Sequence, residues 1–360
     1  MLATSRKAIA GESGPLSDLA WLHGKKGGPG GRRSRSGKNQ IVSTTSSWID
    51  DALDRATELL QAGELVGVPT ETVYGIAADA TDPLAIAKLF EVKGRSSFHP
   101  ISVLCRSASM AFDLLTDVPE SAVRLAARFW PGPLTMILPK RSEAVPDLLT
   151  AGLPFVGVRV PDHPLTLALL ERFGRPLAVP SANRSGHVSP TTAEAVRREF
   201  GEEIHLVLDG GACQIGVEST ILSFAWTPPA LIRQGGVPHE LLEQEIGTID
   251  HATASPSTPG ALPRHYVMRT PLSLVLEPEA IPLPQREAAG LLAWGPCREG
   301  FAICLSLSPA YRLKEAAANL FRQLRELDQS GLVRIFAMPV PDCGLGRAIN
   351  ERLRKAAASL

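Results

Sequence analysis

The sequence predicts an α/β protein, and three observations support this fold class. Short apolar runs rich in Val, Ile and Leu, such as 66–68 and 156–160, alternate along the chain with stretches whose apolar residues recur at helical spacing. Several of these runs are followed at once by hydroxyl, amide, cationic or glycine residues, as in α/β sheets that bind a ligand beyond their strand ends. The 360 residues, 44% of them apolar, are enough for two domains.

The composition argues against several classes of protein. The formal net charge of zero disfavours a surface that grips nucleic acid as a whole, although it leaves room for a local basic groove. The five cysteines are scattered and odd in number, which predicts a reducing compartment without a disulfide framework or zinc site. No apolar run reaches the roughly 18–20 residues of a membrane span. We therefore expect a cytoplasmic protein with no membrane partner.

The beginning of the chain differs from the rest. Residues 1–45 include a basic run at 24–37, rich in Gly and Ser and without periodicity, which predicts a disordered extension. A mitochondrial transit peptide, an extension from an early start codon and a nucleic-acid-binding arm are the three interpretations that this composition leaves open. Ordered structure is expected from residue 46, where a helical pattern runs to Gly63.

Polar groups gather after the first apolar run. Thr70 and Thr72 follow the run 66–68, and the next helical stretch leads to Lys93 and Arg95 on either side of a glycine. The planar fork of Arg and the mobile charge of Lys suit a ligand with several anionic oxygens, so we predict a phosphate-bearing ligand here. Taken singly, a Thr at a strand end is more often a turn or cap residue, and a Lys-x-Arg a solvated surface. The grouping of these residues favours the functional interpretation.

Further elements follow in alternation up to residue 236. Helices are expected over 83–91, 118–130, 164–173 and 191–200, and strands over 134–138, 156–160, 177–180, 204–208, 221–224 and 231–233. Arg159 lies inside an apolar run and needs a partner, because an unpaired buried charge is too costly. We favour a ligand carboxylate over exposure on an edge strand. Thr191 has capping-box spacing to Glu194, so Ser189 and Thr191 are equally well explained by structure alone.

The second half of the chain predicts a smaller unit. Residues 249–270, rich in Thr, Ser and Pro, show no period and predict a linker. Strands are expected over 272–276, 290–294, 301–305 and 333–340, and helices over 316–327 and 346–358. Their alternation predicts an α/β domain with a mostly parallel sheet. The sequence contains neither GxxxxGK[ST] nor GxGxxG, so a P-loop or a standard dinucleotide-binding fold is not indicated.

Several motifs in order along the chain resemble one known family. They are PTETVYG (69–75), KGR (93–95), WPGPLT (130–135), VGVRVPDHP (156–164), PSAN (180–183), GVESTI (216–221) and LIRQGG (231–236). Together they resemble the YrdC-like domain of the threonylcarbamoyl-AMP synthase family. PGALPRHY (259–266) and the helical stretches near 316–328 and 344–357 resemble the linker and C-terminal domain of the long, two-domain form.

This resemblance implies a fold, an activity and partners. The implied fold is a twisted YrdC-like sheet with a deep basic cavity, joined to a smaller Rossmann-like α/β domain. The implied organisation is an extension over 1–45, a catalytic domain over 46–248, a linker or lid over 249–270 and a C-terminal domain over 271–360. The implied enzyme joins L-threonine, bicarbonate and ATP, with Mg²⁺ on the polyphosphate, into threonylcarbamoyl-AMP and pyrophosphate. Its product would pass to the machinery that transfers the threonylcarbamoyl group to tRNA.

The motifs also imply roles for individual residues. The implied threonine-binding residues are Thr70, Thr72, Arg159, Val179 and Ser219, with Arg159 pairing the carboxylate. The implied ATP-binding residues are Lys93, Arg95, Ser97, Ser181, Asn183, Ser189, Arg233, His265 and Tyr266, the last two from the linker. Lys93, Arg95 and Ser219 are implied to be catalytic through positioning and charge neutralisation, without a nucleophilic triad or a side chain that ligates metal.

Two other functions fit parts of the pattern. A YrdC-like RNA-binding protein without synthase activity would use the basic cavity or the basic run near the N-terminus. A YrdC-like module in another carbamoyl-adenylate chemistry, as in hydrogenase maturation, is disfavoured because the sequence lacks acylphosphatase-like and zinc-finger segments. The sequence departs from the family pattern at Ser96, His99 and Leu104, and in the linker at 261–263.

Overall fold

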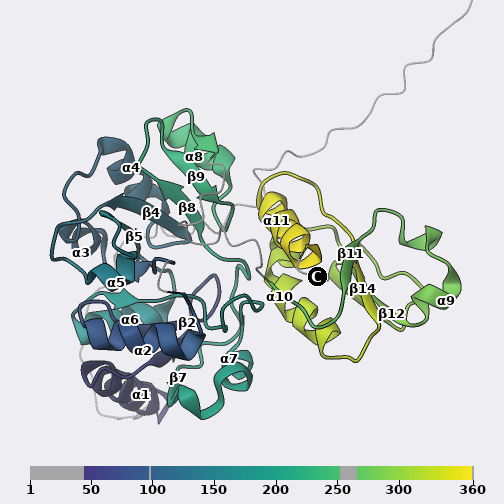
Figure 1. Ribbon diagram of the computed structural model, residues 1–360, viewed down its shortest axis with the longest axis horizontal. Coiled ribbons are helices and arrows are strands. Elements are labelled where there is room, and N and C mark those ends of the chain that lie inside the picture. Colours follow the sequence, from purple (N-terminus) through teal and green to yellow (C-terminus); the bar gives the residue numbers. More distant parts are fainter. Residues whose placement is uncertain (1–43, 97–98, 252–265, 359–360) are drawn as a thin grey trace, which may run out of the picture. The chain divides into compact units, whose positions relative to one another are not determined.

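The computed structural model describes residues 44–96, 99–251 and 266–358. Ser97, His265, the linker residues 261–263 and the basic run near the N-terminus lie outside the described residues. Residues 44–251 form a ten-stranded sheet with its helices, called the N-terminal part below, and residues 266–358 form a four-stranded sheet with its helices, called the C-terminal part (Figure 1). Among the described residues, no helix is long and apolar enough to cross a membrane.

The N-terminal part is a mixed sheet in the order β10-β9-β8-β4-β5-β3-β6-β2-β1-β7. Its strands are β1 (Val66–Val68), β2 (Gly75–Asp79), β3 (Val103–Leu104), β4 (Leu134–Pro139), β5 (Phe155–Arg159), β6 (Leu177–Ala178), β7 (Leu206–Val207), β8 (Thr220–Ser223), β9 (Ala230–Arg233) and β10 (Asp250–His251). Its helices are α1 (Thr44–Gln61), α2 (Pro83–Lys93), α3 (Ala108–Asp113), α4 (Glu120–Phe129), α5 (Asp147–Thr150), α6 (Pro164–Phe173), α7 (Ala193–Phe200) and α8 (His239–Ile246). Strand β1 runs antiparallel to β2 and parallel to β7, so parallel and antiparallel pairs occur side by side.

Helices α1 and α6 lie next to each other in Figure 1 and cover one region of this sheet. Leu53 and Leu60 of α1 and Leu169 of α6 share a buried cluster with Val66 and Val68 of β1. Strand β1 is buried throughout, as expected for an apolar run without alternation. Burial of this apolar surface anchors the strand from which Thr70 and Thr72 follow.

Helix α2 ends in a way that sets up the Lys-Gly-Arg turn. Asp82 caps its beginning by accepting a hydrogen bond from the Leu84 amide, and Pro83 occupies the first helical position. Gly94 ends the helix in the left-handed region with φ +56°, where a side chain would be strained. On either side of this turn, Lys93 and Arg95 reach different partners: Lys93 donates to the carbonyl oxygens of Ser181 and Asn183, and Arg95 to those of His99 and Pro100.

The structure corrects three details of the sequence-based expectation. Residues Gly75–Asp79, which had no predicted element, form β2; two alanines in five residues weaken the strand signal, and pairing with β1 and β6 supplies the stability instead. Helix α7 is capped by Thr192, whose hydroxyl accepts from the Ala195 amide, so the predicted cap at Thr191 was wrong by one position. The predicted linker begins with β10, which pairs parallel to β9.

The C-terminal part is a parallel sheet in the order β11-β14-β12-β13, which confirms the prediction of a mostly parallel sheet. Its strands are β11 (Leu272–Leu274), β12 (Ala289–Trp294), β13 (Ile303–Ser308) and β14 (Arg334–Ala337). Its helices are α9 (Leu283–Arg286), α10 (Leu313–Asp328) and α11 (Leu345–Ala357). Helices α10 and α11 lie where helices were predicted over 316–327 and 346–358, pack against each other, and each bury one apolar face.

Candidate active site

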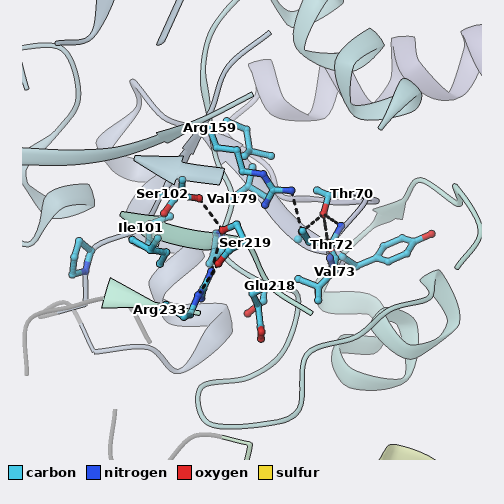
Figure 2. A pocket seen from close by; sticks show the side chains of 18 of the residues that line it. Thr70, Thr72, Val73, Ile101, Ser102, Arg159, Val179, Glu218, Ser219 and Arg233 are labelled. Carbon is cyan, nitrogen blue, oxygen red and sulfur yellow. Dashed lines mark hydrogen bonds between the residues drawn. The ribbon is translucent and has the colours of Figure 1, made fainter. Parts of the chain in front are cut away.

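A cavity that is partly open to solvent lies within the N-terminal part (Figure 2). Its lining comes from segments that are distant in sequence: the turn after β1, the loop after α2, the ends of β5 and β9, the loop after β6 and the residues before β8. Eight of the predicted site residues line it, namely Thr70, Thr72, Arg95, Arg159, Val179, Ser181, Ser219 and Arg233.

Gly75 allows the loop after β6 to approach this lining. A Cβ atom at Gly75 would lie 2.2 Å from Cγ1 of Val179 and 3.1 Å from the carbonyl oxygen of Pro180. Gly75 also forms an isolated β-bridge with Ser181. Gly75 therefore permits a close approach between β2 and the loop after β6.

Arg159 is buried and has a protein carboxylate as its partner. Its Nη2 donates to Oε1 of Glu71 at 2.6 Å and to Oγ1 of Thr72 at 3.1 Å, and its Nε donates to the carbonyl oxygen of Gly132 at 3.1 Å. The other oxygen of Glu71 accepts from the amide of Asp162 at 3.0 Å. The sequence required a partner for Arg159 but did not identify Glu71. These contacts fix the guanidinium plane at the cavity wall.

Thr70 and Thr72 have a structural and a lining role at once. Oγ1 of Thr70 donates to the carbonyl oxygen of Val73 at 2.6 Å and accepts from the amides of Thr72 and Val73, each at 3.2 Å. The two threonine hydroxyls lie 2.8 Å apart. The turn after β1 is therefore stabilised by its own side chains, and the same side chains face the cavity in Figure 2.

Ser219 is held between two neighbours at the other end of the lining. Its Oγ lies 2.8 Å from Oγ1 of Thr135 and accepts from Nη2 of Arg233 at 3.1 Å. Nε of Arg233 donates to the Ser219 carbonyl oxygen at 3.1 Å. Figure 2 shows Arg233 directed at Ser219, whereas Arg159 extends toward Thr72. Thr135 is a lining hydroxyl that the sequence prediction missed, although it belongs to the WPGPLT motif.

Arg95 and Arg233 both line the cavity, and the charge of Arg233 disfavours the charge of Arg95. Burial and the charge of Arg233 lower the pKa of Arg95 to about 10, so Arg95 remains charged at neutral pH. Burial also lowers the pKa of Arg233, with the charge of Glu218 acting in the opposite direction. Arg95 is fixed by donation to the carbonyl oxygens of His99 and Pro100, at 3.2 and 3.1 Å. An anion beside both guanidinium groups would relieve this unfavourable electrostatic situation.

Lys93 does not line the cavity. Its ammonium group donates to the carbonyl oxygens of Ser181 and Asn183, and it is almost fully buried. Burial, aided by the charge of Arg95, lowers the pKa of Lys93 well below its usual value. The side chain therefore braces the loop 181–183 from behind, a placement that the Lys-x-Arg spacing could not reveal.

Asn183, Ser189 and Tyr266 also lie behind the lining. Nδ2 of Asn183 donates to the carbonyl oxygens of Arg184 and His187, which closes the loop after β6 on itself. The hydroxyls of Ser189 and Tyr266 both donate to Oε1 of Glu218, at 2.7 and 3.1 Å. Glu218 itself lines the cavity and was missed by the sequence prediction, although it directly precedes Ser219.

An α/β fold with a cavity lined by Arg95, Arg159, Arg233 and several hydroxyls defines a protein that binds an anionic small molecule. A family model described as telomere recombination matches residues 58–235, and a model described as threonylcarbamoyl-AMP synthase, C-terminal domain, matches residues 235–358. The threonylcarbamoyl-AMP synthase of Pyrococcus abyssi is 40% identical over 318 residues, which cover 84% of this chain and 92% of the relative. That of Bacillus subtilis is 39% identical over 338 residues, covering 88% and 96%.

A solved structure leads to the same family. The crystal structure of Pyrococcus abyssi Sua5 complexed with L-threonine superposes with a TM-score of 0.79 at 38% identity, covering 85% of this chain and 94% of that one. The chain belongs to the threonylcarbamoyl-AMP synthase family, in its long form with a Sua5-type C-terminal domain. The names of these relatives favour the synthase interpretation over the RNA-binding alternative.

Proposed function

We propose that this protein is an L-threonylcarbamoyladenylate synthase, which forms threonylcarbamoyl-AMP and pyrophosphate from L-threonine, bicarbonate and ATP. The observation that carries the proposal is the distribution of charge along one cavity. Figure 2 shows Arg159 with Thr70 and Thr72 on one side of Ser219, and Arg233 on the other. Arg95 also lines the cavity, close enough to Arg233 for the charge of Arg233 to lower the pKa of Arg95. Such a cavity suits two anionic substrates that must meet at one point.

The Arg159 side suits the amino acid. Glu71, Thr72 and Gly132 hold Nε and Nη2 of Arg159, and no hydrogen bond from its Nη1 to another described residue is present. A free donor on a fixed guanidinium is well placed to take a carboxylate. The Thr70 hydroxyl and the apolar Val179 supply polar and methyl contacts for a small β-hydroxy side chain. The L-threonine in the solved relative supports this assignment.

The Arg95 side suits the nucleotide. We assign the phosphates to Arg95 and Arg233, and the loop from Ser181 to Asn183, braced by Lys93, to the base or ribose. Lys93, Asn183, Ser189 and Tyr266 then act on ATP mainly by holding the lining residues. Ser97 and His265, assigned to ATP by resemblance, keep that assignment as part of the proposal.

The reaction needs little covalent participation from the protein. The neutral amine of threonine forms an N–C bond with carbon dioxide or bicarbonate and becomes a carbamate. With carbon dioxide the nitrogen loses a proton to solvent, and with bicarbonate a water molecule leaves. A carbamate oxygen then attacks the α-phosphorus of ATP, and the bond from that phosphorus to the bridging oxygen breaks, releasing pyrophosphate. Arg95 and Arg233 lower the barrier by stabilising charge on the phosphates, and Ser219 positions the meeting point.

Magnesium enters as part of the substrate MgATP. The described residues contain no cluster of three or more His, Cys, Asp or Glu side chains that could hold a metal ion. Glu218, the carboxylate in the described lining, is already engaged by Ser189, Tyr266 and Arg352. These groups therefore suit a Mg²⁺ ion that is bound by the polyphosphate oxygens of ATP rather than by protein side chains.

The proposal also assigns a role to each segment of the chain. We assign synthesis to residues 46–248, a connecting and covering role to 249–270 and a separate α/β domain to 271–360. The product is a mixed anhydride that water would hydrolyse, so it must pass to an enzyme class that transfers the threonylcarbamoyl group to adenosine in tRNA.

The proposal is tested by pyrophosphate release from purified protein. Release is expected only when ATP, L-threonine and bicarbonate are all present, and omission of any one should abolish it. Arg233→Ala should lower the rate through a higher KM for ATP, because one of two phosphate-facing guanidinium groups is lost. Arg198→Ala, on the exposed face of α7, is the matched control. Release that is independent of threonine would contradict the proposal.

A further inference from the structure

Arg352 of α11 is fully buried, although arginine is among the residues least often found inside proteins. Its Nε and Nη2 donate to the same carboxylate oxygen of Glu218, Oε2, at 3.1 and 3.0 Å. Its Nη1 donates to the carbonyl oxygen of Gln234 at 2.7 Å. The exposed fraction of the side chain is 0% for Arg352 and 5% for Glu218. A residue of the C-terminal part is thus an ion-pair partner of a cavity residue.

The second oxygen of Glu218 is also engaged. Oε1 accepts from the hydroxyls of Ser189 and Tyr266, at 2.7 and 3.1 Å. The Tyr266 ring stacks on Phe321 of α10 with 5.3 Å between ring centroids. The C-terminal part, which begins at Tyr266, therefore contributes a hydrogen-bond donor to each oxygen of this carboxylate, Tyr266 to Oε1 and Arg352 to Oε2.

The charge of Glu218 matters because of its position. It lines the cavity next to Ser219, among the arginines that we assign to the phosphates. An uncompensated carboxylate here would attract Arg233, the neighbour whose charge it already favours, and would repel an anionic ligand. In the structure Arg233 instead donates to the backbone and hydroxyl of Ser219, while Arg352 neutralises Glu218.

We propose that Arg352 is a positioning residue of the synthase site: by anchoring and neutralising Glu218, it keeps Arg233 available for the ATP phosphates. The proposal rests on the function proposed above. It also makes the C-terminal part a component of the site, because a chain without α11 would lose the ion pair between Arg352 and Glu218. Removal of one partner of a buried pair is more damaging than removal of both, since it leaves an isolated buried charge.

The test compares three changes at the ion pair with one control. Arg352→Met removes the cation and keeps much of the side-chain volume, Arg352→Lys keeps the charge, and the double variant Glu218→Gln/Arg352→Met removes both charges. Arg354→Met is the matched control on the same helix, because Arg354 is exposed and pairs only weakly with Asp342, at 3.5 Å. Circular dichroism and thermal unfolding establish that each variant is folded.

The primary measurement is ATP affinity by calorimetry, followed by KM for ATP, KM for threonine and kcat. Arg352→Met should weaken ATP binding by about tenfold or more, which corresponds to about 1.4 kcal/mol. Its KM for threonine should change much less. The double variant and Arg352→Lys should each recover most of the ATP affinity, and Arg354→Met should match the unmodified protein.

Two results would overturn the proposal. One is ATP affinity unchanged in Arg352→Met; the other is a double variant as impaired as Arg352→Met, which would mean that only packing is at stake. If Arg352→Met does not fold, the two remaining variants decide. Arg352→Lys and the double variant should both keep most of the ATP affinity, and a double variant that binds ATP about tenfold more weakly than Arg352→Lys would overturn the proposal. Calorimetry separates this proposal from the synthase assignment: an unmodified protein that binds ATP but releases no pyrophosphate would refute the assignment alone.

Discussion

Replacement of Arg159 by lysine tests the threonine side of the cavity, because it keeps the charge and removes the planar fork. In the protein, Arg159 makes hydrogen bonds to Glu71, Thr72 and Gly132 at once. A lysine ammonium is a single point of charge and cannot reproduce this geometry while also facing a substrate carboxylate. We expect the lysine to keep its ion pair with Glu71 and to lose its hydrogen bond to the substrate.

The magnitude follows from the one hydrogen bond that the threonine carboxylate would no longer receive. A hydrogen bond between a charged donor and a charged acceptor contributes about 1.5–3 kcal/mol. Its absence should therefore raise KM for threonine roughly 10- to 150-fold. The carbonyl oxygen of Gly132 also loses its donor, which should lower the free energy of unfolding by about 1–3 kcal/mol. KM for ATP should stay close to its original value.

The assay is steady-state pyrophosphate release with threonine and ATP varied separately, beside urea unfolding. Arg106→Lys is the matched control, since Arg106 lies at the surface and pairs with the exposed Glu171, where a change of charge geometry is worth little. The reasoning fails if Arg159→Lys is folded and its KM for threonine is unchanged. It also fails if KM for ATP rises as much as KM for threonine.

Two further changes probe residues around the loop after β6. Gly75→Ala would place a methyl group 2.2 Å from Cγ1 of Val179. We therefore expect the free energy of unfolding to fall by about 1–3 kcal/mol and KM for threonine to rise. Unchanged urea unfolding would contradict this, because it would show that β2 and the loop after β6 can move apart. Burial lowers the pKa of Lys93 in the folded protein below the 10.5 of a free lysine. Between these two pKa values the unfolded chain binds more protons, so stability should rise with pH. Lys93→Met should lose this rise in thermal unfolding followed from neutral to alkaline pH, and identical slopes would contradict the depressed pKa.

The elements with a clear period were predictable from the sequence. Helices α2, α6 and α10 and strands β4 and β5 lie where apolar spacing placed them, because each is long enough to show a repeat. Strand β3 has two residues and was not predicted, because two residues have no period; β6, also of two residues, lies within the strand expected over 177–180. Their pairing depends on neighbours that the sequence pattern does not identify, so the mixed order of the sheet could not be predicted.

The site was predictable as a set of residues but not as a set of contacts. Arg159 visibly needed a partner, yet Glu71 lies 88 positions earlier, and nothing in the local pattern selects it. Glu218 and Arg352 are separated by 134 positions, and Glu218 lies in the loop before β8 whereas Arg352 lies in α11. Lys93 shows that a cation beside a glycine turn can be directed at backbone carbonyl oxygens instead of the cavity.

The most direct test of the synthase assignment follows the carbon of bicarbonate. The purified protein is incubated with ATP, L-threonine and isotopically labelled bicarbonate, and the nucleotide products are separated and analysed by mass spectrometry before they hydrolyse. The proposed function predicts an adenylate that contains both threonine and the labelled carbon, formed in step with pyrophosphate. Pyrophosphate release with no label in any adenylate would contradict it.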